Sequence, residues 1–328
     1  MLELSRENFS QNMKQNSAFK SAESCGWMKR EESIMGTAIS VELWSDDELA
    51  GNAAIDAVME EMHRIDRVMS PHKADSELSI INRNAAAGPV LISSEMFHLL
   101  ARAAHFSQLS DGAFDITYAA VGRLFDYRLR TRPNAVELAK ARLAVGYRHV
   151  QLDAQNLTVQ FSRSDVCIDL GGFAKGHAVD NATKILRQLG IAHANVSAGG
   201  DSRVIGDRRG RPWMIGVRDP RTYNGVIAAL PLEDTSISTS GDYERYFIED
   251  GTRFHHLIDP ATGRSPNTVR SVTILAEDGL TTEAFSKIVF VLGLKKGMQL
   301  IAAQQGIDAV VVDTDGVLHY STGLLAPQ

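Results

Sequence analysis

The order in which strand-like and helical stretches follow one another constrains the fold of this chain more than any other feature of its sequence. AISVELW alternates apolar and polar residues and predicts a half-buried strand, whereas DDELAGNAAIDAVMEEMHRIDRVMS and SSEMFHLLARAAHFSQLS repeat apolar residues at helical spacing. CIDLGGFAKGHAVDNATKILRQLG runs from a short apolar strand through glycines into a third helix. Further strands are predicted before two closing helices and the strand DAVVVD: HANVSAG, SRVIG, WMIGVRD, GVIAALPL and TSISTS. Because strands and helices do not alternate strictly, we expect an α+β fold rather than a doubly wound parallel sheet.

We expect one domain, residues 31–328, after a flexible N-terminal leader of residues 1–30. The composition, 44% hydrophobic and 23% charged, is that of an ordinary globular protein, and no repeat or linker divides the chain. The leader carries charges and amides throughout, whereas a signal peptide needs an apolar run of about 7 residues. No segment approaches the roughly 18 apolar residues of a membrane span. These features predict a cytoplasmic protein with no membrane partner.

Charge and cysteine content exclude two further classes of protein. The net charge of -6 comes without a basic block, so we expect no nucleic-acid partner. Cys25 and Cys167 are far apart, and neither lies in a CxxC or Cys/His pattern. A disulfide framework and a zinc site are therefore not expected.

A glycine-rich segment, DLGGFAKGHAVD (residues 169–180), joins the predicted strand to the third helix. Glycines there let backbone N–H groups approach a phosphate, the helix N-terminus favours its negative charge, and Lys175 adds a cation. The segment is neither GxGxxG nor a P-loop. A tight turn with a solvated lysine is the equally open alternative.

Two histidines precede a turn in FHHLIDPATGRSPN. On a strand, His255 and His256 would point to opposite sides, so at most one of them faces a given site. A histidine at a strand end could serve as general base, because its ordinary pKa lies near working pH. The alternative is a partly buried histidine whose hydrogen bonds are satisfied within the protein.

DGAFDITY places an aromatic ring, a carboxylate and a hydroxyl close together, at Phe114, Asp115 and Thr117. Such a set suits a purine pocket, where the carboxylate accepts from the exocyclic amine, but it also suits a plain helix N-terminus. The segment TSGDYERYF could line the same cleft.

TTEAFSKIVFVLG puts Glu283 and Lys287 at i and i+4 at the start of an apolar helix. Such a pair shares one helix face and contributes roughly 0.3 kcal/mol as an ordinary surface ion pair. The alternative is the remains of a metal site.

Taken in order, these motifs resemble the ApbE family of FAD:protein FMN transferases, also called flavin transferases. The resemblance runs from about Ile34 to Gly293 and rests on nine segments: MGTAISVEL, SPHKADSELSIINRN, DGAFDITY, IDLGGFAKGHAVDNATKIL, HANVSAGGD, PWMIGVRDP, STSGDYERYF, HHLIDPATGRSP and TTEAFSKIVFVLG. It implies a single α+β domain with a mixed or antiparallel sheet and flanking helices, binding FAD and usually Mg²⁺. It also implies transfer of FMN from FAD to a Ser or Thr hydroxyl of an acceptor protein, with release of AMP. Some family members instead hydrolyse FAD to FMN and AMP.

The resemblance also implies roles for individual residues. Met35 matches a residue beside the flavin nucleotide, and the segment of Ala113, Phe114 and Asp115 matches the part that holds the adenosine half. Asp169 and Lys175 match residues that contact the nucleotide, and the carbonyl of Gly172 matches a backbone ligand of the metal. His256 matches the histidine that activates the acceptor hydroxyl.

Two positions depart from the family pattern. His72 stands where the family usually has a tyrosine that stacks on the cofactor. Glu283 and Lys287 stand where the family has an Asp and a Thr whose oxygens bind magnesium, and an ammonium has no lone pair to offer.

Two interpretations of this second departure stay open. In one, Lys287 turns aside and Glu283, helped by Ser286 or Asp278, binds a weakened magnesium. In the other, the Lys287 ammonium lies at the cation position, held by Glu283. The chain would then be a slow transferase or an FAD-binding protein without turnover.

Overall fold

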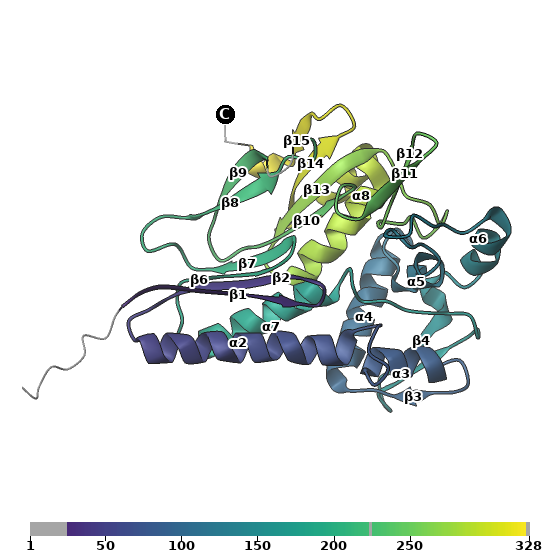
Figure 1. Cartoon of the computed structure of the whole chain (residues 1–328), viewed down its shortest axis with the longest axis horizontal. Coiled ribbons are helices and arrows are strands. Elements are labelled where there is room, and N and C mark those ends of the chain that lie inside the picture. Colours follow the sequence, from purple (N-terminus) through teal and green to yellow (C-terminus); the bar gives the residue numbers. More distant parts are fainter. Residues whose placement is uncertain (1–24, 223–224, 326–328) are drawn as a thin grey trace, which may run out of the picture.

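Strands from both halves of the chain meet in one large sheet. A computed structural model describes residues 25–222 and 225–325 (Figure 1). Within these residues, eight strands pair antiparallel in the order β1-β2-β6-β7-β10-β13-β14-β15. Their bounds are β1 Gly26–Ile34, β2 Thr37–Ser45, β6 Ala194–Ala198, β7 Asp201–Ile205, β10 Ser236–Gly241, β13 Val269–Ala276, β14 Asp308–Asp313 and β15 Leu318–Tyr320.

Three long helices, α2 (Glu48–Met69), α7 (Ala174–Gln188) and α8 (Gly279–Ala302), cover one face of this sheet (Figure 1). Each presents an apolar stripe to the strands: Val58, Met62 and Ile65 of α2 pack with Ile39, Val41 and Leu43 of β2, all fully buried. Asp47 caps the start of α2 by accepting from the N–H groups of Leu49 and Ala50. The main core therefore lies between the helices and the sheet.

A hairpin of β8 (Trp213–Arg218) and β9 (Val226–Leu232) covers part of the opposite face. There Trp213 of the hairpin packs with Ile237 of β10 and Leu275 of β13 in a second, smaller core. Along β10 the side chains alternate, so the serines on either side of Ile237 face the helices. This alternation places hydroxyls beside α8.

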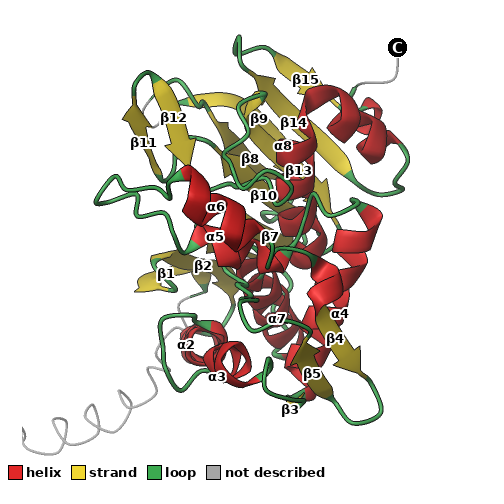
Figure 2. Cartoon of the chain, turned by 90° about the vertical axis from the view of Figure 1, so that its right-hand side faces the viewer, coloured by secondary structure: helices red, strands yellow, loops and turns green. Residues whose placement is uncertain are grey.

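The middle of the chain forms a lobe at one end of the sheet (Figures 1 and 2). Its helices and helical turns are α3 (Glu77–Asn84), α4 (Ser94–Leu109), η1 (Ile116–Tyr118), α5 (Ala119–Gly122), α6 (Ala135–Arg142) and η2 (Tyr147–His149). Its strands form a small sheet in the order β3 (Val90–Leu91), β5 (Thr158–Phe161), β4 (Val150–Asp153). Two further elements are the ribbon of β11 (Tyr246–Glu249) and β12 (Thr252–His255) and the C-terminal turn η3 (Thr322–Leu324).

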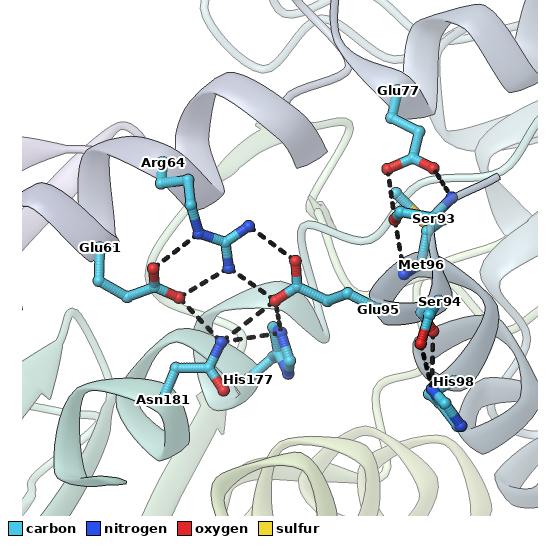
Figure 3. A network of polar contacts seen from close by, with 10 residues as sticks. All are labelled: Glu61, Arg64, Glu77, Ser93, Ser94, Glu95, Met96, His98, His177 and Asn181. Carbon is cyan, nitrogen blue, oxygen red and sulfur yellow. Dashed lines mark hydrogen bonds and ion pairs between the residues drawn. The ribbon is translucent and has the colours of Figure 1, made fainter. Parts of the chain in front are cut away.

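A polar network ties α2, α4 and α7 together (Figure 3). Arg64 of α2 forms two hydrogen bonds with Glu61 and two with Glu95 of α4, at 2.7–2.8 Å. His177 of α7 lies 2.7 Å from Glu95, and the amide of Asn181 donates to Glu61 at 2.8 Å. The network therefore fixes the first turns of α7 relative to the lobe.

The structure confirms the α+β class, with a sheet that is antiparallel throughout the described residues. The predicted strand AISVELW is β2, the two long helical patterns are α2 and α4, and DAVVVD is β14. The predicted closing helices form α8, interrupted where Gly293 leaves the helical conformation at φ 74°.

One predicted strand is absent. Residues 167–170 form no strand, because their backbone is satisfied elsewhere. The side-chain amide of Asn82 exchanges two hydrogen bonds with the backbone of Ile168, and the N–H of Asp169 donates to the carbonyl of Ile116. A side chain thus replaces the neighbouring strand.

The predicted leader differs from the structure at its end. Residues 1–24 lie outside the described residues, but Gly26–Ile34 forms β1, which pairs with β2 along its whole length. The run Lys29–Glu32 places four consecutive charges on this edge strand, and that charge hides the strand in the sequence. The sheet therefore begins before residue 31.

Candidate active site

The N-terminal turns of α7 and α8 lie in backbone contact. A Cβ added to Gly176 would lie 2.3 Å from the carbonyl oxygen of Gly279, so only glycine allows this approach. Asp180 holds the two helices in place: its carboxylate accepts from the N–H of Gly279 at 2.8 Å and from that of Leu280 at 3.2 Å. Arg203 neutralises Asp180 at 2.7 Å. Two helix N-termini, both with positive dipole ends, therefore meet at one point.

Four side chains form a charged cluster at this point: Lys175, Asp201, Glu283 and Lys287. The Lys175 ammonium donates to Asp201 and, at 2.5 Å, to Oε1 of Glu283. The other carboxylate oxygen of Glu283 accepts from the N–H of Gly176 at 2.7 Å. The Lys287 ammonium lies 3.3 Å from Oε1 of the same glutamate, whose side chain has no exposed area. The Glu283–Lys287 pair is thus not an ordinary surface ion pair.

Burial and mutual charge set the ionisation of this cluster. Burial lowers the pKa of Lys175, but the carboxylates of Asp201 and Glu283 outweigh it and the net shift is upward. Burial raises the pKa of Asp201, yet the two lysines turn the net shift downward. Burial lowers the pKa of Lys287, and the attraction of Glu283 offsets that only in part. The carboxylate of Asp201 and the ammonium of Lys175 are therefore firmly charged.

Buried hydroxyls of β10 and α8 line the inner side of the cluster. Ser238 donates to Asp201 at 2.5 Å, and Ser286 lies 2.8 Å from Ser240. Ser286 also donates to the main-chain carbonyl of Glu283 at 2.9 Å. Ser240 belongs to the segment TSGDYERYF, which was expected to line the cleft.

The residues present do not fit a magnesium ion. Mg²⁺ requires oxygen ligands in near-octahedral geometry, whereas both carboxylates of the charged cluster already hold an ammonium. Lys287 is not turned aside, because a Cβ at Gly172, the expected carbonyl ligand, would lie 3.4 Å from its Cε. Asp278, one expected helper, caps α8 by accepting from Thr281. In the part of the chain that the structure describes, no three His, Cys, Asp or Glu side chains gather as metal ligands.

His256 follows β12 directly, and its backbone N–H donates to the carbonyl of Arg245 at 3.0 Å. Its ring Nδ1 is buried without a hydrogen-bond partner among the described residues. Burial lowers the pKa of His256 to about 3, and His255, Arg245, Lys287 and Lys175 act in the same direction. The imidazole is therefore neutral at physiological pH and able to accept a proton.

His255 is satisfied at one of its two ring nitrogens, whereas its Nδ1, like that of His256, is buried without a hydrogen-bond partner among the described residues. Its Nε2–H donates to the carbonyl of Pro266 at 2.7 Å, and its ring packs edge-on against Phe290. It is 1% exposed, so it serves the packing of the ribbon.

Three further predicted cofactor residues, Asp169, His72 and Met35, come from three different parts of the fold. Asp169 accepts from the N–H of Gly171 at 2.5 Å, and burial raises its pKa against the opposing charges of His72 and Arg245. His72 is exposed and so has a free face for stacking. Met35 lies at the tip of the β1–β2 hairpin with φ 54°. The structure thus gathers Asp169, His72 and Arg245 near one another.

The segment predicted to hold adenosine is engaged within the protein. Oδ1 of Asp115 accepts from the N–H and hydroxyl of Thr117, and Oδ2 accepts from the N–H of Tyr147. Phe114 packs against other buried phenylalanines, and Ala113 is also buried. Asp115 thus caps the N-terminus of η1, and its contact with adenosine stays a prediction.

Asp180, Asp201 and Arg245 were not singled out as functional residues from the sequence. Asp201 had a usable signal, because it follows Gly199 and Gly200 at the end of the quoted segment HANVSAGGD. Arg245 and Asp180 lie in quoted segments, but nothing local marks a carboxylate that caps a helix from a distant part of the sequence.

Residues 35–311 match the ApbE family. The chain belongs to the ApbE family. A relative from Treponema pallidum, named FAD:protein FMN transferase, is 32% identical over 317 residues, which are 90% of this chain and 87% of the relative.

Solved ApbE structures agree with this assignment. The ApbE protein of Thermotoga maritima is 34% identical with a TM-score of 0.84, and the alignment covers 91% of this chain and 98% of that one. The flavin transferase ApbE of Vibrio cholerae is 28% identical with a TM-score of 0.80, at the same coverage. Both the family resemblance and the single-domain α+β fold that it implied are thus confirmed. Among the helices that the structure describes, none is long and apolar enough to cross a membrane.

Proposed function

We propose that this chain is an FAD:protein FMN transferase that moves FMN from FAD to a Ser or Thr hydroxyl of an acceptor protein and releases AMP. One observation carries the proposal: in a chain of the ApbE family, a neutral His256, whose Nδ1 has no hydrogen-bond partner among the described residues, lies within the field of the buried lysines Lys175 and Lys287. This combination provides a base beside a site for a pyrophosphate.

The site residues divide the work of an in-line phosphoryl transfer. The positive dipole ends of α7 and α8 and the nearby ammonium groups favour the negative charge of the pyrophosphate. His256 accepts the proton of the acceptor hydroxyl as its oxygen bonds to the phosphorus of the FMN half. The bond to the bridging oxygen breaks, and AMP leaves with that oxygen.

The cations that lower the pKa of His256 also link binding to catalysis. Arg245, Lys287 and Lys175 disfavour the protonated imidazole in the free protein. A bound pyrophosphate neutralises their charge, so the pKa of His256 rises when FAD is in place. The base is therefore strengthened by its own substrate.

The direct test incubates the purified full chain with FAD and a peptide that carries a Ser/Thr flavinylation motif. We expect AMP in solution and an FMN-bearing peptide by mass spectrometry, and neither product with His256→Gln. AMP and FMN without modified peptide would show FAD hydrolysis instead. Intact FAD on the protein would show a binding protein without turnover.

The identity of the acceptor and the cytoplasmic location stay proposals. We propose that the acceptor presents its hydroxyl from a short exposed segment, because it must reach His256 beside the β11–β12 ribbon. Cell fractionation of the tagged full chain tests the location.

A further inference from the structure

The Lys287 ammonium has unused hydrogen-bonding capacity in a buried place. It has three N–H donors, and among the described residues its only hydrogen bond is the 3.3 Å contact with Glu283. Only 19% of the side chain is exposed. Burying a cation with two donors unpaired is costly, so this arrangement favours a ligand that brings acceptor oxygens.

Lys175 differs from Lys287, although both contact Oε1 of Glu283. Lys175 is shared between two carboxylates, Asp201 and Glu283, at short distances. The positive charge of Lys175 is therefore neutralised by these two carboxylates. Lys287 is therefore the cation of the charged cluster that is free to serve a ligand.

The position of Lys287 is that of a phosphate contact. Its Cε lies against Gly172, in the glycine segment that precedes α7. Its charge also acts on His256, so the base lies within its electrostatic reach. In an in-line transfer the pyrophosphate occupies this space.

We propose that the Lys287 ammonium takes the place of a divalent cation and hydrogen-bonds the pyrophosphate of FAD, so that this chain binds FAD without magnesium. The inference rests on the proposed function. It follows from the misfit between the charged cluster and Mg²⁺: a metal at Glu283 would have to displace two ammonium groups.

The test measures FAD binding by the full chain through flavin fluorescence, in excess EDTA and in excess magnesium. We expect the same Kd in both. Binding only with magnesium would overturn this inference and leave the proposed function standing. Binding in neither condition would overturn both.

Variants assign the effect to one ammonium. Lys287→Met should weaken FAD binding in EDTA by about tenfold to a hundredfold, as expected for loss of charge-assisted hydrogen bonds, while Lys287→Arg retains most of the affinity. Lys296→Met is the matched control, because Lys296 is an exposed lysine of the same helix. Unchanged binding by a folded Lys287→Met would overturn the inference.

Discussion

At the residue scale, the two adjacent histidines show how far a local pattern reaches. The strand period predicts that His255 and His256 face different surroundings, and the structure gives them different partners. The sequence could favour His256 only through the family resemblance. What distinguishes the two rings physically is Pro266, whose carbonyl accepts a hydrogen bond from Nε2 of His255 from a later turn of the chain.

The first prediction concerns the base. Replacing His256 with Gln should lower the rate of FMN transfer about 100- to 10,000-fold, the range typical of a lost general base. FAD affinity should change little, because the substitution leaves Lys175 and Lys287 in place. Stopped assays for AMP combined with a fluorescence titration check both parts. A comparable loss of affinity would instead assign His256 to binding.

The charged cluster shows the limit of prediction from spacing. The i, i+4 rule places Glu283 and Lys287 on one face of α8, and the structure agrees. Lys175 and Asp201 reach the same glutamate from α7 and β7, and no local pattern could have paired them. The metal question is therefore decided by contacts between elements.

At the element scale, the site depends on how closely α7 and α8 approach. The sequence contains Gly176 and Gly279 but does not indicate that they meet, and only the packed structure shows that each one faces the backbone of the other. Asp180 then caps α8 across this contact. Helix positions could be predicted from sequence because the apolar period is local, whereas their docking could not.

Gly176→Ala should separate these helices. The added methyl would meet the carbonyl of Gly279, so we expect a loss of about 1–3 kcal/mol in unfolding free energy together with weaker FAD binding. Gly88→Ala is the control, since a Cβ there meets nothing within 4 Å. Urea unfolding of both variants measures the difference, and equal midpoints would contradict the close contact.

The network of Figure 3 makes a second prediction at this scale. Arg64 and His177 hold the pKa of Glu95 well below its usual range, so its carboxylate is ionised and engaged. Glu95→Gln should cost about 1 kcal/mol, because the site is partly exposed. Glu60→Gln removes an exposed pair with Arg67 on α2 and should destabilise the protein less than Glu95→Gln does, because solvent screens an exposed pair. Thermal unfolding of the two variants compares them, and equal shifts would show that the network adds nothing.

At the scale of the whole molecule, the order of elements predicted the class but not the strand order. β2 pairs with β6 and β10 with β13, pairings that join distant parts of the sequence. Hydrophobic periods identify strands without identifying their neighbours. The second core under the β8–β9 hairpin could not be predicted from the sequence either, because its strands show the same alternation as those of the large sheet.

The free energy of unfolding should depend on pH because His256 is buried in its neutral form. Below the ordinary histidine pKa of 6.5, the unfolded chain binds a proton at His256, whereas the folded chain does so only near a pKa of about 3. The unfolding free energy is thus highest, with respect to His256, above pH 6.5, and it falls as the pH is lowered because only the unfolded chain takes up the proton. His256→Gln should remove up to about 2 kcal/mol of the stability lost between about pH 7.5 and about pH 5. Urea unfolding of both chains at both pH values cancels the other titrating groups, and parallel losses would contradict a buried neutral ring.

The contact between α7 and α8 also governs when the protein acquires its substrate. Lys175 leaves the ribosome long before Glu283 and Lys287, and β7, which packs against α7, pairs with β10, which is also made after α7. A nascent chain therefore has no pyrophosphate site until α8 has been synthesised and docked. FAD cannot guide the folding of the first half, and only a finished chain competes for the cellular flavin pool.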